Sequence, residues 1–305
     1  MKKTAFVFPG QGAQKFGMGK EFYEQYKVSR EIYDQASEWL NMDVPALCFE
    51  ENDRLDQTHY TQIGLLVTEI ALFEAIKEKG FVPSVTAGLS LGEYAALHAA
   101  GRISAKDAVC LIDKRGLFMQ EAVPHGGAMA AVLGLDMDTI SEICAGTEGI
   151  VEVANDNCPG QVVISGEAGA VETASVRLKE AGAKRVMSLN VSGPFHSSMM
   201  KGAGERLAEE LEHVQWLDSD IPYVSNTLAR YITDSKQTKD LLIRQVSESV
   251  RWRQSMELMI QNGVEAFVEI GPGKTIAGFL RRIDRKIPCI NIEKPEDLEK
   301  LEVLR

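Results

Sequence analysis

The stretch VPSVTAGLSLGEYAALHAAG, residues 82–101, contains the pattern Gly-x-Ser-x-Gly at residues 88–92. Residues 82–89 are typical of a buried strand, and the alanine-rich residues 91–100, closed by Gly101, are typical of a helix. Between a strand and a helix, the pattern predicts a sharp turn that lifts the Ser90 hydroxyl out of a sheet. The backbone N–H groups at the start of the helix, that of Leu91 among them, then lie where an oxyanion forms. The pattern favours a nucleophilic Ser90 over a tight turn with an incidental serine.

Composition narrows the class of protein. The 305 residues include 33 Lys and Arg against 44 Asp and Glu, a net charge of −11, and 45% of them are hydrophobic. This is typical of a folded globular protein, and the negative charge argues against broad nucleic-acid binding. No apolar run approaches the roughly 18 residues of a membrane span. The five cysteines have neither C-x-x-C nor zinc spacing, so we expect no metal site, reduced thiols and a cytoplasmic protein.

Strands and helices alternate around the Ser90 turn as in an α/β fold. We expect a buried strand at residues 4–8, helices at 20–40 and 62–79, and a strand at 264–269 followed by a helix that ends near residue 280. The apolar residues of the 62–79 segment recur at helical spacing, which makes it the strongest of these predictions.

The middle of the chain has a different pattern, in the order β-α-β-β-α-β. Its strands are expected at 128–133, 150–154, 162–165 and 185–189, its helices at 137–144 and 167–181, and a turn-rich link at 155–160. This order is typical of a ferredoxin-like unit. We therefore predict an α/β-hydrolase-like core with a parallel sheet, formed by residues 1–126 and 191–305, and an inserted ferredoxin-like subdomain at 127–190.

A serine nucleophile needs a general base, and five histidines are candidates. Position along the chain suggests surface or packing roles for four of them: His59, His98, His125 and His213. His196 lies in the loop Ser-Gly-Pro-Phe-His-Ser-Ser, which opens a helix just after the inserted unit. Loops at such junctions often carry catalytic groups. Position alone leaves a catalytic role and a helix-capping role for His196 equally open.

Seven short blocks along the chain resemble one known family in their content and their order. They are FPGQG at 8–12, GLSLGEY at 88–94, KRG at 114–116, NCPGQVVI at 157–164, GPFH at 193–196, RQV at 244–246 and EIGPGK at 269–274. With these blocks the sequence resembles the malonyl-CoA:acyl carrier protein transacylase family over nearly its whole length.

The resemblance implies a role for each matching site residue. Ser90 matches the nucleophile and His196 the general base. The other matches are Arg115 to the arginine that holds the free carboxylate of malonyl, Gln11 and Leu91 to the backbone oxyanion donors, and Gln245 to the glutamine whose carbonyl oxygen orients the histidine. Without the resemblance, Arg115 would be interpreted as an exposed helix residue. A guanidinium can grip a carboxylate with two hydrogen bonds, which fits the implied role.

Other positions bear on the substrate cleft. Phe195 fits the family's malonyl-selecting pattern, because a bulky ring leaves no room for an α-methyl group. Asn155 and Asn157 match polar positions that line the family's cleft, although ordinary turn chemistry explains them equally well. Leu89 departs from the family, since many members have histidine before the nucleophile.

The resemblance implies an [acyl-carrier-protein] S-malonyltransferase of fatty-acid synthesis. Its partners are malonyl-CoA and holo-acyl carrier protein, and it needs no cofactor. Two alternatives remain: a stand-alone malonyl acyltransferase that serves a polyketide synthase, and a serine thioesterase with an acid beside His196. Because carrier proteins of this pathway are acidic, we expect a local basic docking patch formed by Lys274, Arg281, Arg282, Arg285 and Lys286.

Overall fold

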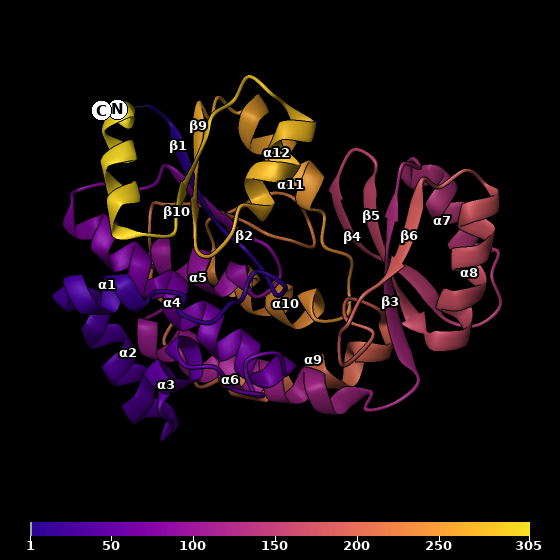
Figure 1. Cartoon of the computed structure of the whole chain (residues 1–305), viewed down its shortest axis with the longest axis horizontal. Coiled ribbons are helices and arrows are strands. Elements are labelled where there is room, and N and C mark those ends of the chain that lie inside the picture. The colour runs from indigo at the N-terminus through magenta and orange to yellow at the C-terminus, as the bar shows by residue number, and fades with distance from the viewer. Residues whose placement is uncertain (1) are drawn as a thin grey trace.

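The computed structural model describes residues 2–305 and contains two β-sheets that lie side by side (Figure 1). The larger sheet has the strand order β10-β9-β1-β2-β7-β8. Its first five strands run parallel, and β8 pairs antiparallel with β7. The strands are β1 (Thr4–Phe8), β2 (Val85–Gly88), β7 (Tyr223–Val224), β8 (Tyr231–Ile232), β9 (Ala266–Ile270) and β10 (Cys289–Ile292). The predicted strand at residues 4–8 is confirmed.

Helices cover both faces of this sheet because alternate residues of its strands point to opposite sides. Phe6 and Phe8 pack into a core with α4 (Thr58–Glu78), α5 (Gly92–Ala99) and α6 (Ala105–Ala122). Ala5 and Val7 pack on the other side with α11 (Trp252–Gln261) and α12 (Thr275–Ile283). The other helices are α1 (Lys20–Gln25), α2 (Lys27–Leu40), α3 (Val44–Phe49), α9 (Lys201–Leu211), α10 (Ser235–Gln245) and the 3₁₀ helices η1 (Ser198–Met200) and η2 (Pro295–Leu304).

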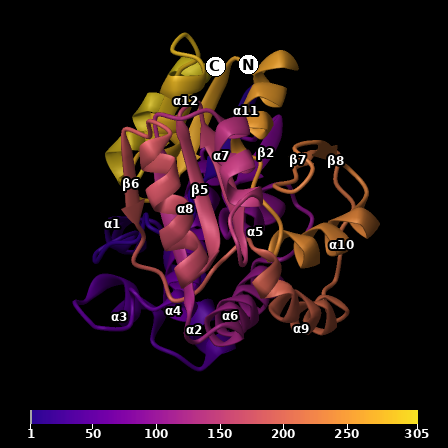
Figure 2. The ribbon, with the colours of Figure 1, turned by 90° about the vertical axis from the view of Figure 1, so that its right-hand side faces the viewer.

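The second sheet is antiparallel, with the strand order β4-β5-β3-β6. Two helices cover its outer face, as Figure 2 shows. Strand alternation turns Ala130 and Val132 toward these helices and Met129 and Ala131 toward the larger sheet. The elements are β3 (Gly127–Leu133), α7 (Met137–Ala145), β4 (Val151–Cys158), β5 (Gln161–Glu167), α8 (Ala168–Glu180) and β6 (Arg185–Ser188), in the β-α-β-β-α-β order that the sequence predicts.

Two local predictions are wrong. The helix expected at 20–40 is interrupted at Tyr26, whose extended backbone (φ −116°, ψ 121°) separates α1 from α2. The link expected at 155–160 is mostly strand, since β4 continues to Cys158. Val250 holds it extended, because the amide of Asp156 donates to the Val250 carbonyl at 3.0 Å. Asn155 and Asn157 are therefore strand residues, and the alternative that they are ordinary turn residues is wrong.

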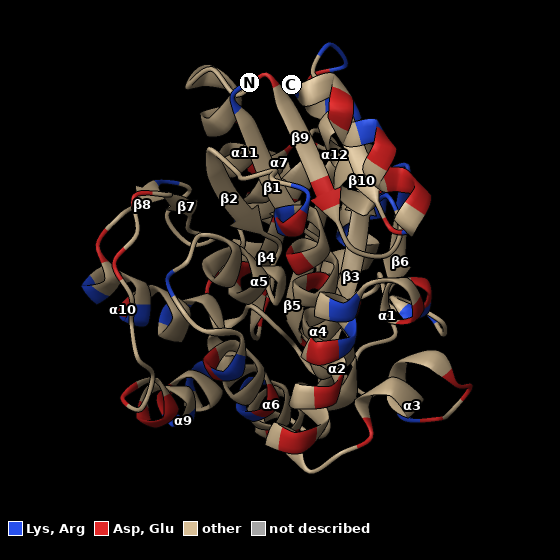
Figure 3. Cartoon of the chain, turned by 90° about the vertical axis from the view of Figure 1, so that its left-hand side faces the viewer, with Lys and Arg blue, Asp and Glu red and all other residues tan. Residues whose placement is uncertain are grey.

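Charged residues lie mainly on the outer helices and loops, and the central strands carry few of them (Figure 3). Across residues 2–305, no helix is both long and apolar enough to cross a membrane.

Candidate functional site

The Ser90 turn (residues 88–92) has the geometry that the sequence predicts. β2 ends at Gly88, α5 begins at Gly92, and Ser90 between them has a positive φ of 54°. A Cβ at Gly88 would lie 1.9 Å from the backbone of Gly92, and a Cβ at Gly92 would lie 2.4 Å from the carbonyl oxygen of Phe8. Both glycines are required because backbone segments approach each other closely here.

His196 is the histidine that contacts Ser90. The Ser90 Oγ lies 2.8 Å from His196 Nε2, and His196 Nδ1 lies 2.8 Å from the carbonyl oxygen of Gln245. A carbonyl can only accept, so Nδ1 carries the proton and Nε2 is free to accept from the serine hydroxyl. The other four histidines lie elsewhere: His59 pairs with Asp113, His98 pairs with Glu74, and His125 and His213 are exposed.

Arg115, on α6, is buried, which overturns the exposed-helix interpretation. Its Nη2 donates to the Ser90 Oγ at 3.1 Å and to the Gln245 Oε1 at 2.8 Å, and its Nη1 donates to the Gln62 Oε1 at 2.5 Å. No carboxylate within residues 2–305 forms an ion pair with this guanidinium. A buried cation without an anionic partner is costly, so the site is electrostatically prepared for an anionic ligand.

Two backbone amides near Ser90 are available to an oxyanion. In the described chain, the N–H groups of Gln11 and Leu91 donate to no protein acceptor. β1 and β2 are parallel neighbours, with Phe8 opposite Gly88, so the loop that follows β1 lies beside the Ser90 turn. This adjacency brings the Gln11 amide to the same edge of the sheet as the Leu91 amide.

A cavity of about 230 Å³ lies in front of Ser90, between the two sheets. The larger sheet and its helices supply part of the lining, and β3, β4 and β5 supply Met129, Ala131, Asn155, Asn157 and Val163. Leu89 and the buried ring of Phe195 also line it. Thus the structure brings all the predicted site residues together: Gln11, Ser90, Leu91, Arg115, Asn155, Asn157, Phe195 and His196 line the cavity, and Gln245 lies directly behind it.

The surroundings of His196 lower its pKa from the ordinary 6.5 to about 4. Burial is the largest cause and the positive charge of Arg115 the second, and hydrogen bonds with the backbone of Gln245 and Glu248 offset them in part. The imidazole is therefore neutral at pH 7, the form that can accept a proton.

We expect the reactivity of the Ser90 hydroxyl toward an acylating reagent to fall with acid at a midpoint near pH 4, because Nε2 accepts no proton once the ring is charged. Short pH-jump assays read by mass spectrometry measure this midpoint, with circular dichroism to check that the protein stays folded. In Arg115→Ala, residual acylation should show a higher midpoint, since a charge that lowers the pKa is gone. A wild-type midpoint near 6.5 would contradict the prediction.

Three site residues escaped the sequence analysis: Gln62, Glu93 and Asn226. Glu93 is buried, and burial raises its pKa to about 8 against the opposing effects of Gln245, Asn226 and Arg115. Its carboxyl oxygens accept from the Gln245 Nε2 at 2.8 Å and from the backbone N–H of Asn226 at 3.3 Å. Glu93 lies in the quoted GLSLGEY block and could have been found there. For Asn226 the sequence carried no signal.

The fold and this site define a class of protein: an α/β enzyme with a serine–histidine pair suited to acyl transfer. In the part of the chain that the structure describes, no group of three or more His, Cys, Asp or Glu could hold a metal ion.

Comparison with known proteins agrees with this class. The family described as "Acyl transferase domain" matches residues 5–285. A malonyl CoA-acyl carrier protein transacylase of Bacillus subtilis (strain 168) is 47% identical over 304 residues, 98% of this chain and 96% of the relative. The crystal structure of MCAT from Streptococcus pneumoniae has a TM-score of 0.95 and 44% identity, and the match covers 99% of this chain and 100% of that one. The chain therefore belongs to the acyl transferase family, among its malonyl CoA-acyl carrier protein transacylases.

Proposed function

We propose that this protein transfers the malonyl group from malonyl-CoA to the phosphopantetheine thiol of an acyl carrier protein through a malonyl-Ser90 intermediate. The observation that carries the proposal is the buried Arg115 guanidinium, which lies 3.1 Å from the Ser90 Oγ without a carboxylate partner in the described chain. A malonyl thioester brings the missing anion next to the nucleophile. The names of the relatives support the same reaction.

In the first half of the cycle, Ser90 Oγ attacks the thioester carbon while its proton passes to His196 Nε2. The amides of Gln11 and Leu91 stabilise the tetrahedral oxyanion, an effect typically worth about 10²–10³ in rate per donor. As the C–S bond breaks, His196 returns the proton to the CoA thiolate. The products are malonyl-Ser90 and free CoA, and the histidine is neutral again.

In the second half, the carrier's thiol gives its proton to His196 and attacks malonyl-Ser90. The same amides hold the oxyanion, and His196 protonates Ser90 Oγ as the ester bond breaks. Gln245 supports both halves, because its carbonyl oxygen keeps the proton on Nδ1 of the ring.

Substrate selection follows from the walls of the cavity. Arg115, held by Gln62 and Gln245, binds the malonyl carboxylate. The Phe195 ring excludes an α-methyl group and so disfavours methylmalonyl. Asn155 and Asn157 offer amide groups to the polar part of the substrate, and the buried Oδ1 of Asn157 has no hydrogen-bond partner within residues 2–305.

Intact-protein mass spectrometry tests the function in two stages. Malonyl-CoA alone should add one malonyl mass to the protein, and holo-acyl carrier protein should then remove that mass and appear as malonyl-carrier. Free malonate and CoA without an adduct would instead favour a thioesterase. The contact of His196 Nδ1 with a carbonyl rather than a carboxylate argues against that alternative.

One observation favours a second pathway for the same chemistry. A type II PKS acyl-carrier protein has been solved in complex with its malonyl-transacylase, which matches this chain at 38% identity and a TM-score of 0.96, over 99% of this chain and 100% of that one. We propose fatty-acid synthesis as the pathway, as the relatives' names favour, and service to a polyketide synthase as the alternative. The ratio of transfer rates to the two kinds of carrier separates them.

The carrier is proposed to dock on the exposed basic residues that precede, end and follow α12. The Arg282 Nη1 donates to the Oε1 of Gln161 at 3.3 Å, and Gln161 belongs to β5 and lines the cavity. Arg282 also lines a surface pocket together with Lys184 and Arg185. A second surface pocket is lined by Lys274, Arg281 and Arg285, and Lys286 is exposed next to Arg285 in the sequence.

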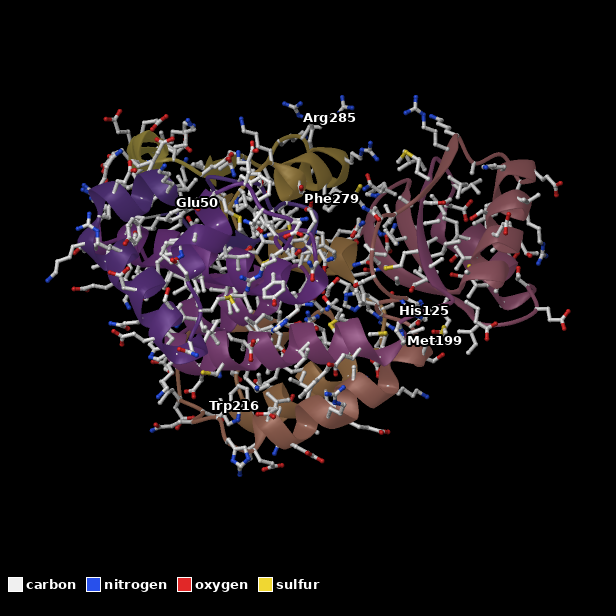
Figure 4. All side chains as sticks on the ribbon, turned by 60° about the horizontal axis from the view of Figure 1, so that its bottom comes forward. Glu50, His125, Met199, Trp216, Phe279 and Arg285 are labelled. Carbon is white, nitrogen blue, oxygen red and sulfur yellow. The ribbon has the colours of Figure 1, made fainter. Side chains whose placement is uncertain are left out.

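Figure 4 shows Phe279 on the side of α12 toward the small sheet and Arg285 at the edge of the molecule. Arg282 thus connects the basic residues of α12 to a residue that lines the cavity.

Reversing two of these charges tests the docking patch. The double variant Arg281→Glu/Arg282→Glu should raise KM for holo-acyl carrier protein about tenfold, because each exposed ion pair is worth up to about 1 kcal/mol. KM for malonyl-CoA should not change. The matched control is Lys20→Glu/Lys236→Glu, an equal charge reversal at exposed lysines that do not line the cavity. Equal effects in the two variants, or on both substrates, would refute the patch.

The proposal also covers the division of the chain into domains and the location of the protein in the cell. We assign residues 1–126 and 191–305 to an α/β-hydrolase-like core and residues 127–190 to a ferredoxin-like subdomain. The strand order of each sheet and the helices of the second one support this division. A cytoplasmic location is supported by the five free thiols: Cys48, Cys110, Cys144, Cys158 and Cys289.

A further inference from the structure

Asn226 lies in the connection between β7 and β8, directly beside the Ser90 turn. Its side chain is buried and makes two hydrogen bonds to the turn. The Oδ1 accepts from the Ser90 amide at 2.8 Å, and the Nδ2 donates to the Gly88 carbonyl at 2.7 Å. One planar amide therefore spans the two peptide groups on either side of Leu89.

The backbone of Asn226 is held just as firmly. Its N–H donates to Glu93 Oε1 at 3.3 Å, and its carbonyl accepts from the Arg251 amide at 2.8 Å. The neighbouring strand β7 pairs with β2, with Val224 opposite Ala87. Asn226 is thus fixed to the same sheet that carries the nucleophile.

The geometry points to Asn226 as a positioning residue that holds Ser90 in its positive-φ conformation and determines which amides serve the oxyanion. Ser90 has φ 54°, a region that non-glycine residues occupy only when the surroundings hold them there. Asn226 supplies that support. Its Oδ1 also accepts from the Ser90 N–H, so that N–H is not available to an oxyanion. The Leu91 N–H donates to no protein group in the described chain and remains available.

Glu93 links this support to the histidine side of the site. Its second oxygen accepts from the Gln245 Nε2 at 2.8 Å, and that same Nε2 donates to the Ser90 carbonyl at 2.7 Å. The Gln245 carbonyl orients His196 at 2.8 Å. Asn226 holds the amide side of Ser90 and Gln245 holds its carbonyl side, and Glu93 joins the two.

The side chains nearest to asparagine in size or chemistry do not reproduce both of its hydrogen bonds. Aspartate keeps an acceptor for the Ser90 N–H but loses the donor to Gly88 and places a charge against a carbonyl oxygen. Glutamine adds a methylene in a space already filled, and alanine loses both bonds. This inference rests on the proposed nucleophilic role of Ser90, and its test keeps the two apart.

The test compares Asn226→Ala and Asn226→Asp with wild type and with Ser225→Ala. The control removes a buried hydroxyl of the same connection that hydrogen-bonds Thr227 rather than the Ser90 turn. Single-turnover formation of malonyl-enzyme should slow about 10²-fold in both Asn226 variants, as expected when a reacting atom is misplaced. The dissociation constant for malonyl-CoA, measured with Ser90→Ala also present, should be the same with and without the Asn226 change.

A second probe does not depend on malonyl chemistry. Phenylmethanesulfonyl fluoride converts a reactive serine to its sulfonate ester and releases fluoride and a proton. Labelling of Ser90 should slow in Asn226→Ala and Asn226→Asp but not in Ser225→Ala, after normalisation to the folded fraction from circular dichroism. A variant that melts earlier yet acylates and labels at the wild-type rate would overturn the positioning role. Wild-type protein that forms no malonyl adduct but labels at Ser90 would overturn the proposed function and leave this inference standing.

Discussion

Ser90→Ala is expected to form no malonyl-enzyme and to lose at least about 10⁴-fold in transfer rate, because the hydroxyl that contacts His196 Nε2 at 2.8 Å is gone. Backbone oxyanion donors and bound substrate account for the small residual rate. Intact-protein mass spectrometry measures the adduct, and peptide mapping places it. The fold should persist, since the turn depends on Gly88 and Gly92 rather than on the hydroxyl.

The matched control is Ser198→Ala, which removes a hydroxyl two residues beyond His196. It should acquire the malonyl mass at the wild-type rate. If Ser90→Ala still forms the adduct, Ser90 is not the nucleophile. If Ser198→Ala loses it as well, the loss does not single out Ser90 as the nucleophile.

Arg115→Ala should reduce kcat/KM for malonyl-CoA by about 10²–10³-fold, because truncating one member of a buried charge pair typically costs about 2–5 kcal/mol. Uncharged acyl-CoA lacks the carboxylate and should lose far less. The measured quantity is the ratio of kcat/KM for malonyl-CoA to that for acetyl-CoA, which is expected to fall steeply.

Two further variants make the Arg115 result specific. Lys114→Ala removes a half-buried charge next to it in the sequence, one that pairs with Asp113 at 3.4 Å, and should leave the ratio unchanged. Arg115→Lys keeps the charge but loses the two-pronged guanidinium, and should recover part of the selectivity. An Arg115→Ala variant that keeps its preference for malonyl would refute the carboxylate-binding role.

The elements with strong local patterns were predictable. The strand at 4–8 has the predicted limits, and the helix expected at 62–79 is α4, which begins four residues earlier. The errors arise where a distant segment outweighs a local preference. The Asn-Asp-Asn-Cys-Pro-Gly stretch favours a turn, yet β4 continues through Cys158 because Val250 supplies a pairing edge.

The candidate site likewise contains residues that a local pattern predicts and residues that only long-range contacts bring to it. Ser90 was predictable because glycine spacing between a strand and a helix is a local signal. Arg115 was assigned only through the family resemblance, since a burial that depends on Gln62 and Gln245 leaves no trace in the residues around it. Asn226 lies 136 residues from Ser90 in the sequence, and no local pattern could relate the two.

By itself the sequence determined the α/β alternation, the order of the middle unit and the turn at Ser90, because these follow from hydrophobic periodicity and backbone sterics over a few residues. The tertiary structure decided the rest. It buried Arg115 without an anionic partner in the described chain, placed His196 against Ser90, and closed Asn226 and Gln245 around the turn. Those contacts depend on which distant segments the parallel sheet brings to one edge, and their energies exist only once the chain has folded.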